Sequence, residues 1–272
     1  MLQLEDLTGE IPFRIYLDLD PAFNQLWHAT QAIDMRLAGH NRFVTVGNAL
    51  GQTTCPIPTC GVQWITTFQP VVLDYWPVGN GILYDGFTTV ANWRGYGSIQ
   101  HDGIFYGQKA HSLRAFMDLP ARSSEKFILA LSIHPDERRD LEALDRNGWL
   151  LLNPAQLLQT PQQYQKFISQ SKAEFGIAKG GYVAAQCGWF SDRSACYLAC
   201  GRPVLAQDTG FGAYLPCGTG LFSFKTHDDA LAAIDSINSD YGRHARAARS
   251  IAVEYFDSNK VLSKLLTAAG VS

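Results

Sequence analysis

The sequence lacks the cysteine and histidine spacings that indicate a metal site or a disulfide framework. Its six cysteines include no C-x2-C pair, and no cysteine has a histidine at zinc-site spacing. Cys196 and Cys200 lie four residues apart on a predicted helix, where they are most simply small packing residues. We therefore expect no bound metal.

Charge and long apolar runs are also scarce. Charged residues make up 17% of the chain and the formal net charge is -3, so nothing indicates nucleic acid or an anionic membrane as a partner. No apolar run reaches the roughly 18 residues that span a bilayer. Residues 1–9 lack the basic and apolar regions of a signal peptide. We expect a cytoplasmic protein without an integral membrane segment.

The remaining composition is that of an ordinary globular protein. With 272 residues, of which 46% are hydrophobic, the chain can bury the core of one large or two small domains. No G-x-G-x-x-G follows any predicted strand, which disfavours a dinucleotide oxidoreductase.

One stretch, residues 181–210, carries the most information. Its apolar run at 182–185 predicts a strand buried on both faces. Ser191 stands where a helix N-cap belongs, and Gly201 suits the left-handed residue after that helix. A second buried strand is predicted at 204–206. The stretch therefore predicts a strand-helix-strand unit of a parallel sheet.

Ligands of such a unit bind outside the carboxyl ends of its strands. The turn at residues 208–212 and the start of the helix should thus face one crevice. That helix begins with Ser191, Asp192, Arg193 and Ser194, so free N–H groups, hydroxyls and a guanidinium gather at the positive end of a helix dipole. The combination suits a phosphate or a sugar hydroxyl. The alternative is a well-capped structural helix with a surface arginine.

The amino-terminal part predicts a single strand-helix-strand unit. A strand at 12–19 ends in Asp18 and Asp20, which are either a general base with its helper or caps for a helix at 22–37. Capping is favoured for Asp20, because Pro21 would take the first helical position. A strand at 42–46 and an irregular stretch follow. We place a domain boundary after residue 78, which divides the chain into segments 1–78 and 79–272.

The second segment predicts a doubly wound α/β domain with a helical tail. Its first strand, at 87–93, ends at Arg94, and a glycine-rich loop then leads to Lys109 at the start of a helix. A lysine there opposes the helix dipole, which costs roughly a few tenths of a kcal/mol unless an anion is bound. The other predicted strands lie at 126–132, 149–152 and 220–224. The other predicted helices begin near residues 135, 160 and 226, and the second of these includes Phe175.

Residues 188–211 carry a resemblance to a known family. They read Gly-Trp-Phe-Ser-Asp-Arg-Ser-Ala-Cys-Tyr-Leu-Ala-Cys-Gly-Arg-Pro-Val-Leu-Ala-Gln-Asp-Thr-Gly-Phe. This segment is similar to one in bacterial glycosyltransferase-like proteins of the GT-B fold. The resemblance covers the whole chain but is specific only here, and it is loose at 18–21, 69–74 and 172–174. It implies a Rossmann-like, nucleotide-sugar binding carboxyl-terminal domain after an incomplete amino-terminal domain.

The resemblance also implies roles for individual residues. Arg94 and Lys109 would contact the donor diphosphate, and the Ser191 helix would face the ribose or the phosphates. The transferred sugar would lie at Asp208, Thr209 and Gly210. GT-B transferases need no bound metal or other cofactor, because basic groups and helix termini stabilise the charge. The expected donor-binding residues are Arg94, Lys109, Lys179, Ser191, Arg193, Ser194, Asp208, Thr209 and Gly210.

Two departures from the family pattern keep a second hypothesis open. Where many retaining GT-B enzymes have a Glu-x7-Glu motif, this chain has Gly188 and Cys196. The acceptor domain looks short, which leaves Asp18 and Asp20 as the only candidate catalytic groups from that half. The chain is therefore either a sugar transferase with an unknown acceptor or a non-catalytic nucleotide-sugar binding module. A homo-oligomer or another partner would complete its acceptor side.

GT-B proteins have a last helix that crosses back to the amino-terminal domain. Here residues 259–269 carry an apolar stripe that needs cover. We expect this helix to pack against the amino-terminal segment.

Overall fold

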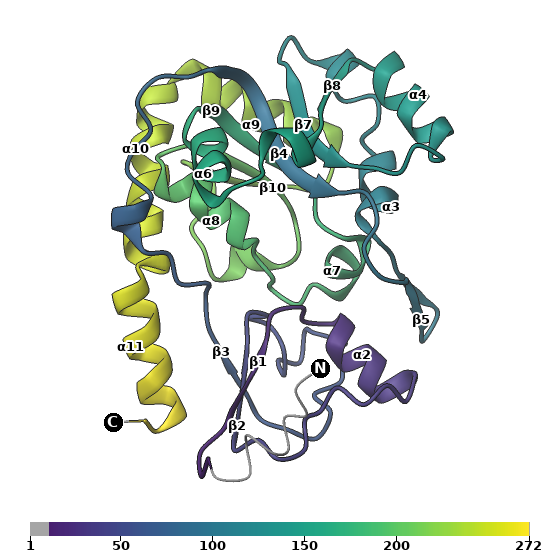
Figure 1. Ribbon diagram of the computed structural model, residues 1–272, viewed down its shortest axis with the longest axis vertical. Coiled ribbons are helices and arrows are strands. Elements are labelled where there is room, and N and C mark those ends of the chain that lie inside the picture. The colour runs from purple at the N-terminus through teal and green to yellow at the C-terminus, as the bar shows by residue number, and fades with distance from the viewer. Residues whose placement is uncertain (1–10, 272) are drawn as a thin grey trace.

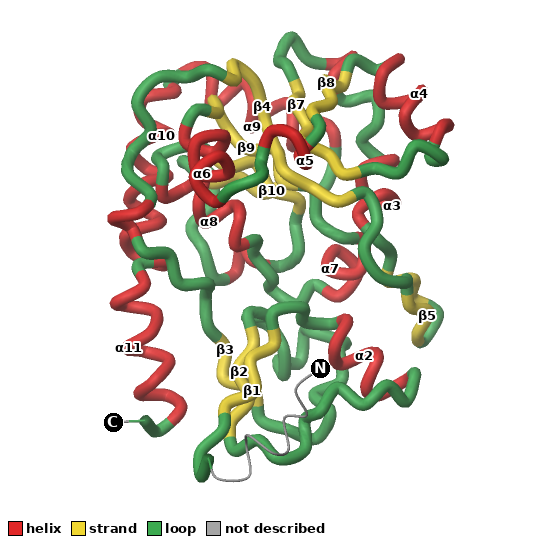
Figure 2. The backbone as a smooth tube through the Cα atoms, in the orientation of Figure 1, coloured by secondary structure: helices red, strands yellow, loops and turns green. Residues whose placement is uncertain are grey.

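A computed structural model describes residues 11–271. Residues 1–10, which begin the predicted segment 1–78, and residue 272 lie outside the described residues. The first part of the chain forms strands β1 (Ile15–Asp18), β2 (Arg42–Thr45) and β3 (Trp64–Thr66), helix α2 (Phe23–Thr30) and the 3-10 turn η1 (Leu73–Tyr75). These strands form a three-stranded parallel sheet in the order β1-β2-β3, at the bottom of Figures 1 and 2.

The rest of the chain builds a larger parallel sheet, in the order β11-β10-β9-β4-β7-β8. Its strands are β4 (Tyr84–Asn92), β7 (Phe127–Ser132), β8 (Trp149–Leu152), β9 (Ser171–Gly176), β10 (Val204–Gln207) and β11 (Leu221–Phe224), and a hairpin consists of β5 (Ile99–His101) and β6 (Ile104–Tyr106). The helices are α3 (Lys109–Arg114), α4 (Arg138–Arg146), α5 (Pro154–Leu157), α6 (Pro161–Ser169), α7 (Gly180–Ala185), α8 (Asp192–Ala199), α9 (His227–Ser239), α10 (Tyr241–Ile251) and α11 (Ser258–Ala269). Short turns are η2 (Pro120–Arg122), η3 (Phe211–Ala213) and the π-helical η4 (Ala252–Phe256).

Helices cover both faces of the larger sheet, as the sequence predicts for a doubly wound domain. The hydrophobic residues of α3, α4 and α9 pack on one face, and those of α6, α8 and α10 on the other. On the first face the rings of Phe127 and Phe224 each contact that of Phe175, with centroids 5.3 and 5.2 Å apart. Each of these fully buried rings contributes about 1.5–3 kcal/mol of transfer free energy.

The strand order reverses between β4 and β9. From β4 the chain builds outward to β7 and β8, and it then returns to the other side of β4 to build β9, β10 and β11. The loops after β4 and β9 therefore leave the sheet in opposite directions, which opens a crevice at their carboxyl ends. The predicted boundary after residue 78 falls between η1 and β4.

Three predicted elements differ from the structure. Residues 182–185 lie in helix α7, and the strand that precedes α8 is β9, which contains Phe175. A four-residue apolar run does not distinguish a strand from a helical turn, and the polar Lys172 and Glu174 hid the strand. Helix α2 ends at Thr30, before the left-handed Ala32 with φ 53°, so the predicted helix at 22–37 is too long.

The last helix crosses back to the amino-terminal part, so this prediction is confirmed. Helix α11 packs against β3, and Arg42 Nε donates to the carbonyl oxygen of Ala269 at 3.1 Å. Val71 and Asp257 form a parallel bridge where the chain enters the helix. Figure 1 shows α11 running from the larger sheet down beside the smaller one. Among residues 11–271, no helix is both long and apolar enough to cross a membrane.

Candidate functional site

A cavity of about 440 Å³ lies at the point where the strand order reverses. Asn92, at the end of β4, and Lys179, which follows β9, stand on its wall together with the start of α8. We call it the donor cavity, after the ligand that the resemblance implies for this edge of the sheet. Its polar and aromatic lining residues are Asn92, Tyr96, Gln108, Lys109, Lys179, Tyr182, Trp189, Ser191, Asp192 and Arg193.

Lys109 is a half-buried cation of this cavity. Its Nζ donates to the carbonyl oxygen of Ile177 at 2.5 Å. Burial lowers the pKa of Lys109 well below its ordinary value, and repulsion from Arg193 and Lys179 adds to the effect while Glu174 opposes it. A bound anion would favour the charged form of Lys109 and raise its pKa. The position of this lysine is therefore more favourable when a phosphate is bound than when the cavity is empty.

Arg193, in the first turn of α8, is held in place by the buried carboxylate of Glu174. Its Nε donates to Glu174 Oε1 at 2.6 Å and its Nη1 to the carbonyl oxygen of Val90 at 3.0 Å. Burial acts to lower the pKa of Arg193, but the attraction of the fully buried Glu174 outweighs it, so the pKa is raised. Among residues 11–271, Nη2 donates to no group. The guanidinium is thus held rigidly with one free edge.

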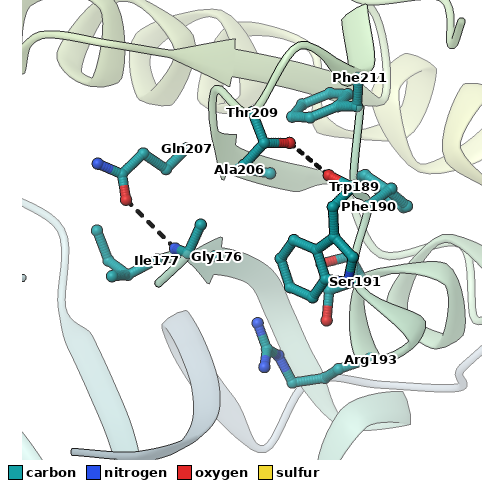
Figure 3. A pocket seen from close by; sticks show the side chains of 12 residues that line it. Gly176, Ile177, Trp189, Phe190, Ser191, Arg193, Ala206, Gln207, Thr209 and Phe211 are labelled. Atoms are coloured by element: carbon teal, nitrogen blue, oxygen red, sulfur yellow. Dashed lines mark hydrogen bonds between the residues drawn. The ribbon is translucent and has the colours of Figure 1, made fainter. Parts of the chain in front are cut away.

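Ser191 occupies the N-cap position of α8, as predicted, but its side chain makes no capping hydrogen bond. Its Oγ lies 3.4 Å from Asp192 Oδ1, which is a weak contact. Ser191 and Arg193 also line a second, much smaller cavity of about 10 Å³, room for a single water. Figure 3 shows them on one side of that small cavity, with Gln207 and Ile177 on the other.

Ser194 and Thr209 line only the small cavity. Ser194 is buried, and Thr209 Oγ1 donates to the carbonyl oxygen of Trp189 (Figure 3). These two predicted site residues therefore lie behind the start of α8 and do not face the donor cavity.

Asp20 reaches the rim of the donor cavity from the smaller sheet. Lys179 Nζ donates to Asp20 Oδ1 and Oδ2 at 3.1 and 3.2 Å, and the hydroxyl of Tyr182 donates to Oδ1. Lys179 also donates to the hydroxyl of Tyr96 and lies 3.9 Å from the centre of that ring. Burial lowers the pKa of Lys179, and the pairing with Asp20 opposes this shift.

Asp18 lies apart from both cavities. It is fully buried and accepts hydrogen bonds from the Asp20 amide at 3.0 Å, Asn24 Nδ2 at 2.6 Å, and Gln25 Nε2 and Thr45 Oγ1 at 2.8 Å each. Burial raises its pKa, with these hydrogen bonds in opposition. Its position is that of a carboxylate which holds β1, α2 and β2 together. Asp20 does not cap α2 as predicted, since Ala22 occupies the N-cap position.

Arg94, Asp208 and Gly210 are also not brought to the donor cavity. Arg94 forms an ion pair with Glu137, which precedes α4, whereas Lys109 lines the donor cavity. A shared contact of Arg94 and Lys109 with a diphosphate stays a prediction. Asp208 accepts from Ser223 Oγ at 3.1 Å and from the amide of Gly210 at 3.4 Å. These contacts order the turn after β10.

Sequence reasoning missed the aromatic residues of the cavity. The rings of Tyr182 and Trp189 stack with centroids 4.1 Å apart and an interplanar angle of 18°, and Tyr96 also lines the cavity. Trp189 belongs to the segment that carries the resemblance, and Tyr96 is an aromatic residue within the glycine-rich loop. Both residues lie in segments that the sequence analysis singled out, so the sequence offered a reason to include them in the predicted site.

Gly188, where the family pattern has an acidic residue, has a physical reason to be glycine. Its φ is +74°, and a Cβ there would stand 2.8 Å from the amide nitrogen of Ala49. The amide of Ala49 also donates to the carbonyl oxygen of Cys187 at 2.9 Å. The two parts of the chain thus touch where an acidic side chain would otherwise project.

Comparison with known proteins gives structural matches only: no family model and no curated protein matches the chain. An α-glucosyltransferase in complex with UDP-glucose and DNA containing an abasic site superposes with a TM-score of 0.64 at 11% identity, over 98% of this chain and 75% of that one. HepE from Anabaena in complex with UDP-glucose gives 0.60 at 13% identity, over 93% and 72%. A glycosyltransferase from Rickettsia africae gives 0.57 at 13% identity, over 94% and 69%. The chain therefore has the GT-B fold of glycosyltransferases, as the resemblance predicted.

Proposed function

We propose that the protein transfers a sugar from a nucleoside-diphosphate sugar to an acceptor. The observation that carries this proposal is the donor cavity of about 440 Å³, with Lys109, Lys179 and Arg193 around the start of α8. Its volume lies in the range of about 300–1,000 Å³ that small-molecule sites occupy. The neighbours that hold UDP-glucose support a UDP-sugar as the first donor to test.

The charge balance suits departure of a nucleoside diphosphate. Negative charge grows on the diphosphate as its bond to the sugar breaks, and cations that are already in place stabilise that charge most. Lys109, Lys179 and the free edge of Arg193 would supply this stabilisation without a bound metal or other cofactor. The stacked rings of Tyr182 and Trp189 would form an apolar wall beside it.

Asp20 is our candidate for the residue that contacts the acceptor hydroxyl. It stands at the rim of the donor cavity on the smaller sheet, whereas Asp18 is enclosed by its hydrogen bonds. For Asp20 to accept a proton, Lys179 would have to move from its carboxylate to a donor phosphate.

The alternative is a nucleotide-sugar binding module without catalysis. One observation favours it: Asp20 accepts hydrogen bonds from both Lys179 and Tyr182, so the carboxylate proposed to contact the acceptor is already occupied. A second copy of the chain or another partner would then supply the acceptor side.

Calorimetric titration with UDP-, GDP- and dTDP-sugars tests binding, and release of nucleoside diphosphate in the presence of candidate acceptors tests transfer. We expect Lys109→Gln to weaken binding about tenfold to a hundredfold, the effect of losing one charge-assisted contact of about 1.5–3 kcal/mol. Lys126→Gln, at an exposed lysine outside the cavity, is the matched control. Absence of nucleotide-sugar binding would refute both proposals, and binding without transfer would leave the binding module.

A further inference from the structure

A second large cavity, of about 340 Å³, lies between the two parts of the chain. Its walls are the end of β3 with residues 66–68, the loop residue Asn48, and the facing sides of η4 and α11. It shares no lining residue with the donor cavity. We call it the crossing cavity, because it exists only where α11 returns to the smaller sheet.

A buried amide in this cavity has no partner. Asn48 is only 7% exposed, and within residues 11–271 its Nδ2 donates to no group. A buried donor left unpaired costs about 1–3 kcal/mol. The neighbouring backbone is fixed on both sides, because Gly47 forms a bridge with Trp189 and the amide of Ala49 donates to the carbonyl oxygen of Cys187 at 2.9 Å. The Asn48 amide therefore lacks an acceptor within the described part of the chain.

The mouth of the crossing cavity is positively charged. Lys260 and Lys264 lie one turn apart on α11 and both line the cavity, together with a single carboxylate, Glu254. Glu254 pairs with Lys260 at 2.7 Å. In the described part of the chain, Lys264 has no carboxylate within ion-pair distance. Glu254 also attracts Lys264 at longer range, but one carboxylate faces two ammonium groups, so the lining keeps an excess of positive charge.

The remaining lining of the crossing cavity is mostly apolar, apart from the hydroxyl-bearing residues Thr66, Thr67 and Tyr255. The apolar lining residues are Ile65, Phe68, Val261, Leu265 and Ala268. A fully polar ion would leave this surface without contacts, and a neutral apolar molecule would leave the amide of Asn48 unpaired. A ligand with an acidic head and an apolar body satisfies both, and its charge is also attracted by Lys264.

We propose that the crossing cavity binds a small amphiphilic anion, whose carboxylate or phosphate head lies between Asn48 and Lys264 and whose apolar body lies against α11. The site is independent of the proposed transferase activity. It does not overlap the donor cavity, so both ligands can be bound together.

The probes are 4-phenylbutyrate and 4-phenylbutyl phosphate, with the neutral 4-phenyl-1-butanol as reference, each followed by saturation-transfer NMR and calorimetry. We expect the anions to bind at least about tenfold more tightly than the alcohol, equivalent to about 1.4 kcal/mol. Comparison of the two anions identifies the preferred head group. The affinity should be the same with saturating UDP-glucose present.

Lys264→Gln and Asn48→Leu should each weaken anion binding about fivefold or more and leave binding of the alcohol unchanged. Lys126→Gln is the control for loss of one surface charge. Lys264 is exposed, so its variant tests the proposal even if Asn48→Leu does not fold. The proposal is overturned if the alcohol binds as tightly as the anions, if UDP-glucose displaces them, or if Lys264→Gln binds them like wild type.

Discussion

Lys179 and Asp20 form an ion pair that joins the two sheets at the donor cavity. Nζ lies 3.1 and 3.2 Å from the carboxylate oxygens, and the two side chains are 23% and 26% exposed. Lys179 follows β9 and lines the cavity, whereas Asp20 follows β1. Asp20, in the amino-terminal part of the chain, thus forms an ion pair with the same lysine that donor phosphates would attract.

Competition for Lys179 gives the first prediction. Asp20→Asn removes a negative charge beside the cavity and frees Lys179, so we expect UDP-glucose to bind about threefold to tenfold more tightly. Lys179→Gln should weaken binding about tenfold to a hundredfold. Calorimetry on both variants measures the two effects. Weaker binding in Asp20→Asn would show that Asp20 itself contacts the donor.

Ser191 gives the second prediction. Because its side chain does not cap α8, we expect Ser191→Ala to change the free energy of unfolding by less than about 0.5 kcal/mol. If its hydroxyl binds the donor, affinity for UDP-glucose falls by about fivefold or more. Urea unfolding and calorimetry separate the two quantities. A loss of about 1 kcal/mol in stability with unchanged affinity would instead indicate a capping role.

The lowered pKa of Lys109 gives the third prediction. Its ammonium is present below that pKa and lost above it, so affinity for UDP-glucose should fall as pH rises through it. UDP-glucose is a suitable probe, because its diphosphate is esterified at both ends and lacks the ionisation near about pH 6 of a terminal phosphate. The fall should be smaller in Lys109→Gln, although Lys179 retains a part of it. An equal pH dependence in both proteins would exclude Lys109 as its source.

The fourth prediction concerns Asp18. Each carboxylate oxygen of Asp18 accepts hydrogen bonds from two donors. In Asp18→Asn, the NH2 group would replace one of these oxygens and face two donors without accepting from them, so the variant should lose about 1–3 kcal/mol of stability. Urea unfolding measures the loss, and Asp85→Asn, at an exposed aspartate, is the control. A loss no greater than the control's would mean that the hydrogen bonds do not favour the ionised carboxylate over an amide.

The sequence predicted the larger sheet well because its strands and helix caps follow local rules. Val204 to Gln207, the start of α8 after Ser191 and the capping box of Thr226 and Asp229 all carry patterns that need no tertiary information. The prediction missed strand β9 because a glutamate such as Glu174 is typical of the protein surface. In the structure Glu174 is buried and pairs with Arg193, nineteen residues later. Pairing over such a distance is invisible to a local pattern.

The sequence predicted part of the candidate site, because some of its residues follow from local patterns. Lys109, Lys179, Ser191 and Arg193 stand next to strand ends or at a helix start, so topology alone brings them together. Arg94 also follows a strand, but the direction of its side chain depends on Glu137, which no spacing rule connects to it.

The return of α11 to β3 also bears on how the chain folds during synthesis. The smaller sheet is made first, but the helix that covers β3 comes about 190 residues later, at 258–269. Long-range contacts of this kind form slowly, and they leave apolar surface exposed until they do. On the ribosome, the smaller sheet therefore waits for the synthesis of α11 before its packing is complete.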